Sequence, residues 1–219
     1  MPPIHHWTHS EPGHDHANQD VALVRPHPDD ALSLLCALAD GQGGRSGGAE
    51  AAHLAASECL SAASTFPAAS LLDEAAWYPI VNAADEAVCE DDDAGYTTLV
   101  GLCVSAGVVC GASCGDSGAL LLAGGRERLL TEHQRKDPPV GSSAARPVAF
   151  SARLVPGWKL LIVSDGVWKG IGWDGIARLA RAHAGEALIA ALRRAALDEN
   201  GGALGDDFSV ILLQDGYRL

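Results

Sequence analysis

The chain has 219 residues and a formal net charge of −13, a length that predicts one globular domain over residues 1–219 with a substantial core. Its excess of acidic residues argues against binding to nucleic acid or an anionic membrane, since both need clustered Lys and Arg, and it favours a cation site. The sequence lacks an apolar run long enough to span a bilayer and the pattern of a signal peptide, so we expect a cytoplasmic protein.

The first part of the chain predicts a hairpin followed by helices. Val21–Arg25 and Ser33–Ala39 are predicted as the two strands of the hairpin, and the second strand leads directly to Asp40. Small residues recur at helical spacing in Ala49–Ala63, which predicts a helix that packs closely on a sheet. A second helical stretch is predicted over Ala69–Val88.

The middle of the chain is rich in strand patterns. Thr97–Val104, Val108–Cys114 and Ala119–Leu122 are apolar runs separated by glycine-containing turns, which predicts an antiparallel meander. The segment Glu132–Pro147 is polar and proline-rich, so it is predicted to be a loop that borders the functional site.

The last part returns to an apolar strand, two helices and a final strand. The predicted elements are Lys159–Ser164, Trp173–Ala182, Glu186–Leu197 and Ser209–Leu213. Along the whole chain, strands and helices come in blocks rather than in strict alternation. This order predicts an α+β fold, a sandwich of two antiparallel sheets flanked by helices, rather than a doubly wound parallel sheet.

Four short acidic motifs stand at the ends of apolar, strand-like runs, and each has a glycine beside an aspartate. Their aspartates are Asp40, Asp116, Asp165 and Asp206. A strand fixes the position of its last residue, and a neighbouring glycine lets backbone and solvent approach, so four distant segments can bring their carboxylates to one point. Ligands that offer only oxygen suit Mg²⁺ or Mn²⁺.

The order of these motifs along the chain resembles the metal-dependent serine/threonine phosphatases of the PPM (type 2C) family. It runs DGxGG, a GTT-like segment at residues 95–98, GDS, SDG and GDDxS, and the resemblance covers nearly the whole chain in a compact bacterial form with a short flap. It implies a β-sandwich flanked by helices, with two Mn or Mg ions that hold a bridging water between the sheets.

The resemblance also implies roles for single residues. Its metal ligands would be Asp20, Asp40, the backbone carbonyl of Gly41, Asp165 and Asp206. Asp40 would bridge both ions, catalysis would depend on Asp40 and Asp165, and Asp116 would correspond to a weaker third-metal position. Two such cations lower the pKa of a shared water and neutralise charge on the phosphoryl oxygens during in-line attack.

Two positions depart from the family's pattern. Asp15 stands where family members often carry an arginine that grips the substrate phosphate, so the candidates for phosphate binding are His9, His14 and His16. The alternative for this histidine-rich stretch is a loosely ordered polar terminus, or fortuitous metal binding. Gln42 stands where many eukaryotic members have a histidine, so protonation of the leaving group would fall to water.

The leading hypothesis is a bacterial protein phosphatase that acts on phosphoserine or phosphothreonine in signalling, with a phosphoprotein substrate and a cognate kinase as partners. Two alternatives stay open. One is a weakly active or non-catalytic relative that binds a regulatory partner, which the missing arginine favours and the retained aspartates oppose. The other is a small-molecule phosphatase, which shares the mechanism and differs in substrate.

Overall fold

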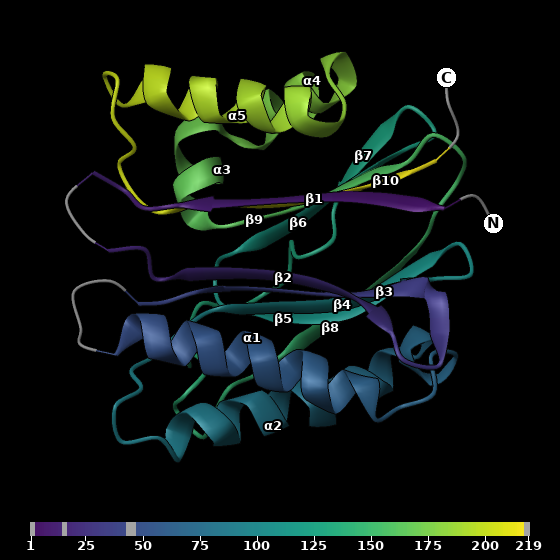
Figure 1. Ribbon diagram of the computed structural model, residues 1–219, viewed down its shortest axis with the longest axis vertical. Helices are drawn as coiled ribbons and strands as arrows, with labels where there is room; N and C mark the ends of the chain where they lie inside the picture. Colours follow the sequence, from purple (N-terminus) through teal and green to yellow (C-terminus); the bar gives the residue numbers. More distant parts are fainter. Residues whose placement is uncertain (1–2, 15–16, 43–46, 217–219) are drawn as a thin grey trace.

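The computed structural model describes residues 3–14, 17–42 and 47–216. In this part of the chain two antiparallel sheets lie face to face, and helices cover both outer faces (Figure 1). Sheet A contains, in spatial order, β1 (Ile4–Glu11), β10 (Phe208–Asp215), β9 (Lys159–Val163), β6 (Gly118–Ala123) and β7 (Arg126–Leu129). Sheet B contains β2 (Asp20–His27), β3 (Asp30–Asp40), β4 (Leu99–Ser105), β5 (Val108–Cys114) and β8 (Val148–Arg153). This arrangement confirms the predicted sandwich.

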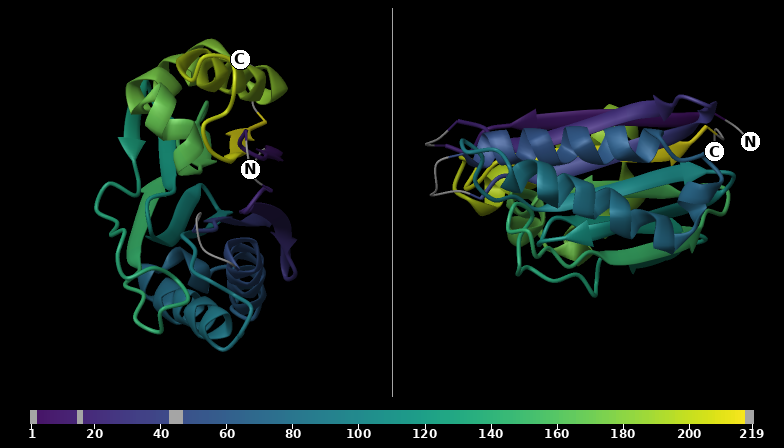
Figure 2. Two further views of the ribbon diagram at one scale, coloured as in Figure 1. Left: turned by 90° about the vertical axis from the view of Figure 1, so that its left-hand side faces the viewer. Right: turned by 90° about the horizontal axis from the view of Figure 1, so that it is seen from below.

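Two helices cover sheet B and three cover sheet A (Figures 1 and 2). On sheet B lie α1 (Gly48–Ser64) and α2 (Trp77–Cys89), and on sheet A lie α3 (Asp165–Ile171), α4 (Trp173–Ala182) and α5 (Gly185–Glu199). None of the described helices is both long and apolar enough to cross a membrane.

The core forms three apolar layers, one between the sheets and one under each set of helices. In β3, for example, Leu34, Cys36 and Leu38 pack between the sheets, whereas the alternate residues pack against the helices. Side chains of a strand point alternately to its two faces, so a strand buried on both sides becomes a continuous apolar run. This explains why the central strands are recognisable from the sequence.

The predicted meander is wrong after β5. β4 and β5 pair in sheet B, but β6 lies in sheet A, where it pairs with β7 and β9. The crossing begins at Gly115, which has a φ of +114° and leaves no room for a Cβ, since that atom would lie 2.5 Å from the Cβ of Thr98. The crossing carries the GDS motif, and therefore Asp116, from one sheet to the other.

Two further expectations need correction. The start of the stretch Ala69–Val88 forms two short 3₁₀ turns, η1 (Ser70–Leu72) and η2 (Glu74–Ala76), because Asp73 between them is extended and its carboxylate accepts the N–H of Ala75. The alternative of a loosely ordered terminus does not hold for residues Ile4–Glu11, because they form a strand that pairs along its full length with β10.

Candidate metal centre

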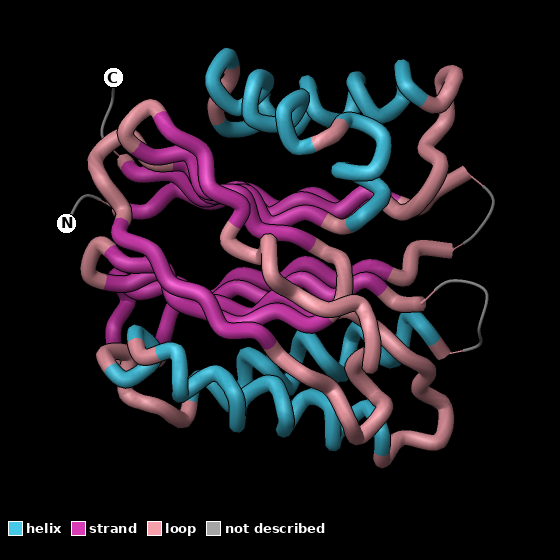
Figure 3. The backbone as a smooth tube through the Cα atoms, turned by 180° about the vertical axis from the view of Figure 1, so that it is seen from behind, coloured by secondary structure: helices cyan, strands magenta, loops and turns pink. Residues whose placement is uncertain are grey.

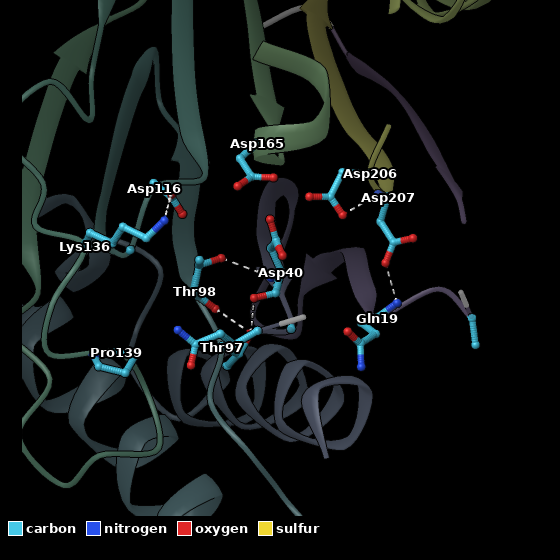
Figure 4. A pocket seen from close by; sticks show the side chains of 14 residues that line it. Gln19, Asp40, Thr97, Thr98, Asp116, Lys136, Pro139, Asp165, Asp206 and Asp207 are labelled. Carbon is cyan, nitrogen blue, oxygen red and sulfur yellow. Dashed lines mark hydrogen bonds and ion pairs between the residues drawn. The ribbon is translucent and has the colours of Figure 1, made fainter. Parts of the chain in front are cut away.

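An acidic cleft of about 580 Å³ opens at one end of the sandwich. Its lining comes from the ends of strands in both sheets and from loop residues. Figure 3 shows loops that pass from one sheet to the other. The residues that line this acidic cleft include Gln19, Asp40, Gly41, Gln42, Thr97, Thr98, Asp116, Lys136, Pro139, Asp165, Asp206 and Asp207 (Figure 4). The four aspartates of the acidic motifs, far apart in the sequence, thus meet at one cleft.

The backbone of Asp40, the last residue of β3, is held by two threonines. The N–H of Asp40 donates to Oγ1 of Thr98 at 3.0 Å, and its carbonyl accepts the N–H of Thr98 at 2.9 Å and the hydroxyl of Thr97 at 2.9 Å. Burial and then the neighbouring carboxylates, first that of Asp20, raise the pKa of Asp40 to about 9. The Asp40 carboxylate is therefore fixed in place where its negative charge is unfavourable.

Asp20 is the cross-strand neighbour of Asp40 in the ladder between β2 and β3. Its side chain is buried, and neither carboxylate oxygen has a hydrogen-bond partner among the described residues. The hydroxyl groups of Ser209 and Ser164 lie near enough to favour its anion but donate their protons to other acceptors, so burial prevails and raises the pKa of Asp20 to about 7. A buried carboxylate without a donor is costly unless a cation compensates it.

Asp165 begins α3 directly after β9. The next residue, Gly166, lies against the backbone just before β10, where a Cβ would be only 2.2 Å from the carbonyl oxygen of Asp207. Only glycine permits this approach, which brings the SDG and GDD motifs side by side. One helical turn after Asp165, Lys169 donates a hydrogen bond to the Asp165 carboxylate.

The adjacent aspartates of the GDD motif have different surroundings. Asp207 is buried, and its two oxygens accept the backbone N–H groups of Gly13 and Gln19 at 2.8 and 2.7 Å. Asp206 is exposed and directs its carboxylate into the cleft, where Oδ1 accepts the N–H of Asp207 at 2.9 Å (Figure 4). Asp207 therefore anchors the chain before β2, while Asp206 contributes charge to the acidic cleft.

Asp116 lies on the crossing between the sheets and faces two lysines. Its Oδ2 is 2.7 Å from Nζ of Lys136 and 3.7 Å from Nζ of Lys169, and its backbone carbonyl accepts the indole N–H of Trp168 at 2.9 Å. Burial alone would lower the pKa of Lys169, but its hydrogen bond to Asp165 and the nearby carboxylate charges raise it above the usual value.

The donor set of the acidic cleft fits hard divalent cations. It offers carboxylate and carbonyl oxygens, and the buried, unpartnered carboxylate of Asp20 lies beside it. The described side chains do not form a group of three or more His, Cys, Asp or Glu already close enough to hold an ion. Of the predicted ligands, Asp40, Gly41, Asp116, Asp165 and Asp206 line the cleft, and Asp20 lies beside Asp40.

The histidines proposed for phosphate binding do not line the cleft where they are described. His9 lies in β1, where its Nε2 contacts Glu11 at 3.1 Å and its ring lies edge-on to Phe208. His14 has an exposed side chain outside the cleft lining, and His16 falls outside the described residues. Among the described residues, the cation that lines the cleft is instead Lys136, which sequence reasoning missed although it lies in the loop predicted to border the site.

Comparisons with known proteins agree with this fold. The family model described as Stage II sporulation protein E (SpoIIE) matches residues 32–214. No curated protein matches the chain.

Solved structures of phosphatases superpose on almost the whole chain. The catalytic domain of the serine/threonine protein phosphatase PstP, in complex with two manganese ions, has a TM-score of 0.78 at 21% identity, with 98% of this chain and 99% of that chain covered. A point variant of a bacterial serine phosphatase has a TM-score of 0.81 at 22% identity, with 98% and 100% covered. PppA of Pseudomonas aeruginosa, a regulatory component of T6SS, has a TM-score of 0.74 at 20% identity, with 97% and 98% covered.

At these identities the structures establish a shared fold, and the family match extends over most of the chain. The chain belongs to the stage II sporulation protein E family, and its fold is that of the PPM-type phosphatases.

Proposed function

We propose that this protein is a metal-dependent serine/threonine phosphatase that hydrolyses phosphoserine and phosphothreonine in proteins. The observation that carries the proposal is the pair Asp20 and Asp40, adjacent across two strands, of which Asp20 is buried without a hydrogen-bond donor. A chain that keeps such a carboxylate beside several others needs cations to offset them, and the cleft around them is wide enough for a phosphorylated side chain.

The residues that would hold two Mn or Mg ions are the carboxylates of Asp20, Asp40, Asp165 and Asp206 and the carbonyl of Gly41. When bound, the ions supply a water of lowered pKa and neutralise charge on the phosphoryl oxygens. PstP, which has the same fold, was solved with two manganese ions, and this supports the proposed number.

The chain's own residues have three tasks in this proposal. Thr97 and Thr98 hold Asp40 in position through its backbone, so that its carboxylate is oriented before any ion binds. Lys136, whose ammonium group lines the cleft, contacts the substrate phosphate in place of the histidines that the sequence suggested. Gln42 also lines the cleft but has no acidic proton, so the leaving oxygen takes its proton from water.

The substrate class rests on the relatives. PstP is described as a serine/threonine protein phosphatase, and we infer a phosphoprotein substrate, with a cognate kinase as the enzyme that forms it. A small-molecule phosphatase would have the same centre, so substrates of both kinds belong in the test.

The test compares turnover of a phosphothreonine peptide and of p-nitrophenyl phosphate with added Mn and with EDTA. We expect turnover that requires metal, is lost in Asp40→Asn and Asp165→Asn, and is retained in Asp92→Asn. Asp92 is a suitable control because it is an exposed aspartate of an acidic turn outside the cleft lining. Full turnover in excess EDTA would refute the metal mechanism, and binding of Mn without any turnover would favour the non-catalytic alternative.

A further inference from the structure

The ammonium group of Lys169 lies between two carboxylates of the acidic cleft. Its Nζ donates a hydrogen bond to Oδ2 of Asp165 and is 3.7 Å from Oδ2 of Asp116. Asp165 and Lys169 are four residues apart on α3, so they share one face of the helix. The lysine therefore bridges the start of α3 and the crossing that carries Asp116.

The side chain of the neighbouring Trp168 also holds this arrangement in place. The neighbouring Trp168 donates its indole N–H to the carbonyl of Asp116 at 2.9 Å and stacks on Trp173, with ring centroids 5.6 Å apart. Nζ of Lys169 is 6.0 Å from the centroid of the Trp168 ring. Because Trp168 ties α3 to the backbone of Asp116, the distance between Lys169 and the Asp116 carboxylate is set by two anchored segments.

A second ammonium group contacts the same carboxylate. Nζ of Lys136 is 2.7 Å from Oδ2 of Asp116, so one lysine from a loop and one from α3 already compensate this one negative charge. A divalent cation held by Asp116 would stand within a few ångströms of both ammonium groups and would be repelled by them.

The formal charges around the cleft also disfavour a third divalent cation. The carboxylates in and beside the cleft are Asp20, Asp40, Asp116, Asp165, Asp206 and Asp207. Against these six stand the ammonium groups of Lys136 and Lys169, which leaves four negative charges. Two divalent cations balance four negative charges, whereas a third would leave two positive charges in excess.

We propose that Lys169 is a built-in cation that takes the place of a third metal ion. Its single positive charge partly offsets the charges of Asp116 and Asp165 from the protein side, so the centre binds two divalent ions and Asp116 is not a metal ligand. Lys169 acts through these two carboxylates and is a positioning residue. The inference rests on the proposed function, because it assumes that the acidic cleft binds divalent cations.

The test counts bound Mn by equilibrium dialysis and elemental analysis, with Mn as the only probe and no substrate. We expect two ions in the parent protein and two in Asp116→Asn. Lys169→Asp should bind three ions, because it replaces the ammonium group by a third carboxylate beside Asp116 and Asp165. Lys169→Arg should stay at two, and the double variant Lys169→Asp with Asp116→Asn should return to two.

Three other ion counts would overturn the inference, and each points to a different cause. Three ions in the parent protein, with the third lost in Asp116→Asn, would show that Asp116 is a ligand, while the phosphatase proposal would stand. Two ions in a folded Lys169→Asp would show that Lys169 does not exclude the third. No bound ion in the parent protein would overturn the metal centre of the proposed function, and this inference with it. The comparison of parent and Asp116→Asn needs no folded Lys169 variant.

Discussion

The two adjacent aspartates of the GDD motif should respond to the same substitution in opposite ways. In Asp207→Asn, one of the two backbone N–H groups now held at 2.7 and 2.8 Å loses its carboxylate oxygen and faces an amide N–H. Loss of one charge-assisted hydrogen bond, with a buried donor left unsatisfied, should lower the free energy of unfolding by about 2–4 kcal/mol. For a chain of this size that lowers Tm by roughly 4–16 °C.

Asp206→Asn should leave the metal-free protein as stable as the parent. The Oδ1 atom of an asparagine can still accept the N–H of Asp207, and the change removes one of the charges that raise the pKa of Asp40. We expect a change within about 0.5 kcal/mol, as for other exposed positions. Its effect should appear in the affinity for Mn, which we expect to fall at least about tenfold. Loss of a group that only hydrogen-bonds to a metal ligand already lowers metal affinity by about tenfold or more, and Asp206 is a proposed ligand itself.

The assay is a pair of thermal melts for each variant, one in EDTA and one over a Mn titration, with calorimetry for the affinity. Asp207→Asn should melt early in EDTA and still gain stability from Mn, since binding to the native state alone adds stability by mass action. Asp206→Asn should melt like the parent in EDTA and gain little. The reasoning is wrong if the two variants exchange these behaviours, or if Asp207→Asn melts like the parent in EDTA.

Three further predictions follow from single groups. The folded-state pKa values of Asp20 and Asp40 are raised from 3.8 to about 7 and about 9, so the stability that these groups contribute is complete below their unfolded pKa and is lost as pH rises through the folded values. The EDTA-treated protein should therefore lose stability from pH 5 to 8, and less steeply in Asp20→Asn. A melting temperature of the metal-free protein that rises over this range would contradict the argument. Asp85→Asn should lower the free energy of unfolding, measured by chemical denaturation, by about 1–3 kcal/mol. The buried Asp85 carboxylate accepts three backbone N–H groups of the loop near the cleft, from Gly141, Ser142 and Ala145. An unchanged denaturation midpoint would show that the loop does not depend on it. Gly41→Ala should destabilise the protein by at least about 1–3 kcal/mol, because its Cβ would lie 2.3 Å from the carbonyl oxygen of Gly48. In the control Gly170→Ala, the new Cβ meets nothing closer than 3.5 Å. Equal stability of the two variants would count against the crowding at Gly41.

The central strands could be predicted from the sequence because they are buried on both faces. Of the edge strands, β2 was predicted as Val21–Arg25, but β1, β7 and β8 were not. β1 and β7 carry histidine, arginine and glutamate along exposed edges, so they lack the continuous apolar run that marks β3 or β10. The sheet to which β6 belongs also could not be predicted. Periodicity reports which faces of a strand are buried, not which strands pair with it, and that depends on the sharp crossing at Gly115.

At the candidate site, the sequence predicted which acidic motifs meet but not what surrounds them. The lysines are the clearest case, since Lys136 and Asp116 come together only because a loop and a crossing converge in space. One signal was available: Asp165 and Lys169 have the four-residue spacing of a helical ion pair, but no helix was predicted over α3. For Asp85, a carboxylate on the otherwise apolar buried stripe of α2 was a signal of a structural anchor.

The centre combines an ordered backbone with an unfavourable arrangement of charge. Around Asp40 and Gly41 the backbone hydrogen bonds are already complete: the N–H of Gly41 donates to the carbonyl of Gln19 at 3.1 Å, and that of Gln42 donates to the carbonyl of Tyr96 at 2.8 Å. Asp207, directly before β10 of sheet A, adds a link to Gln19, directly before β2 of sheet B. Because these contacts do not involve the carboxylates of the proposed ligands, cations that bind there need not order this part of the backbone, and their binding free energy goes mainly to relief of repulsion among carboxylates. Removal of metal should therefore lower stability while leaving the sandwich folded, in contrast to small domains that fold only around their metal.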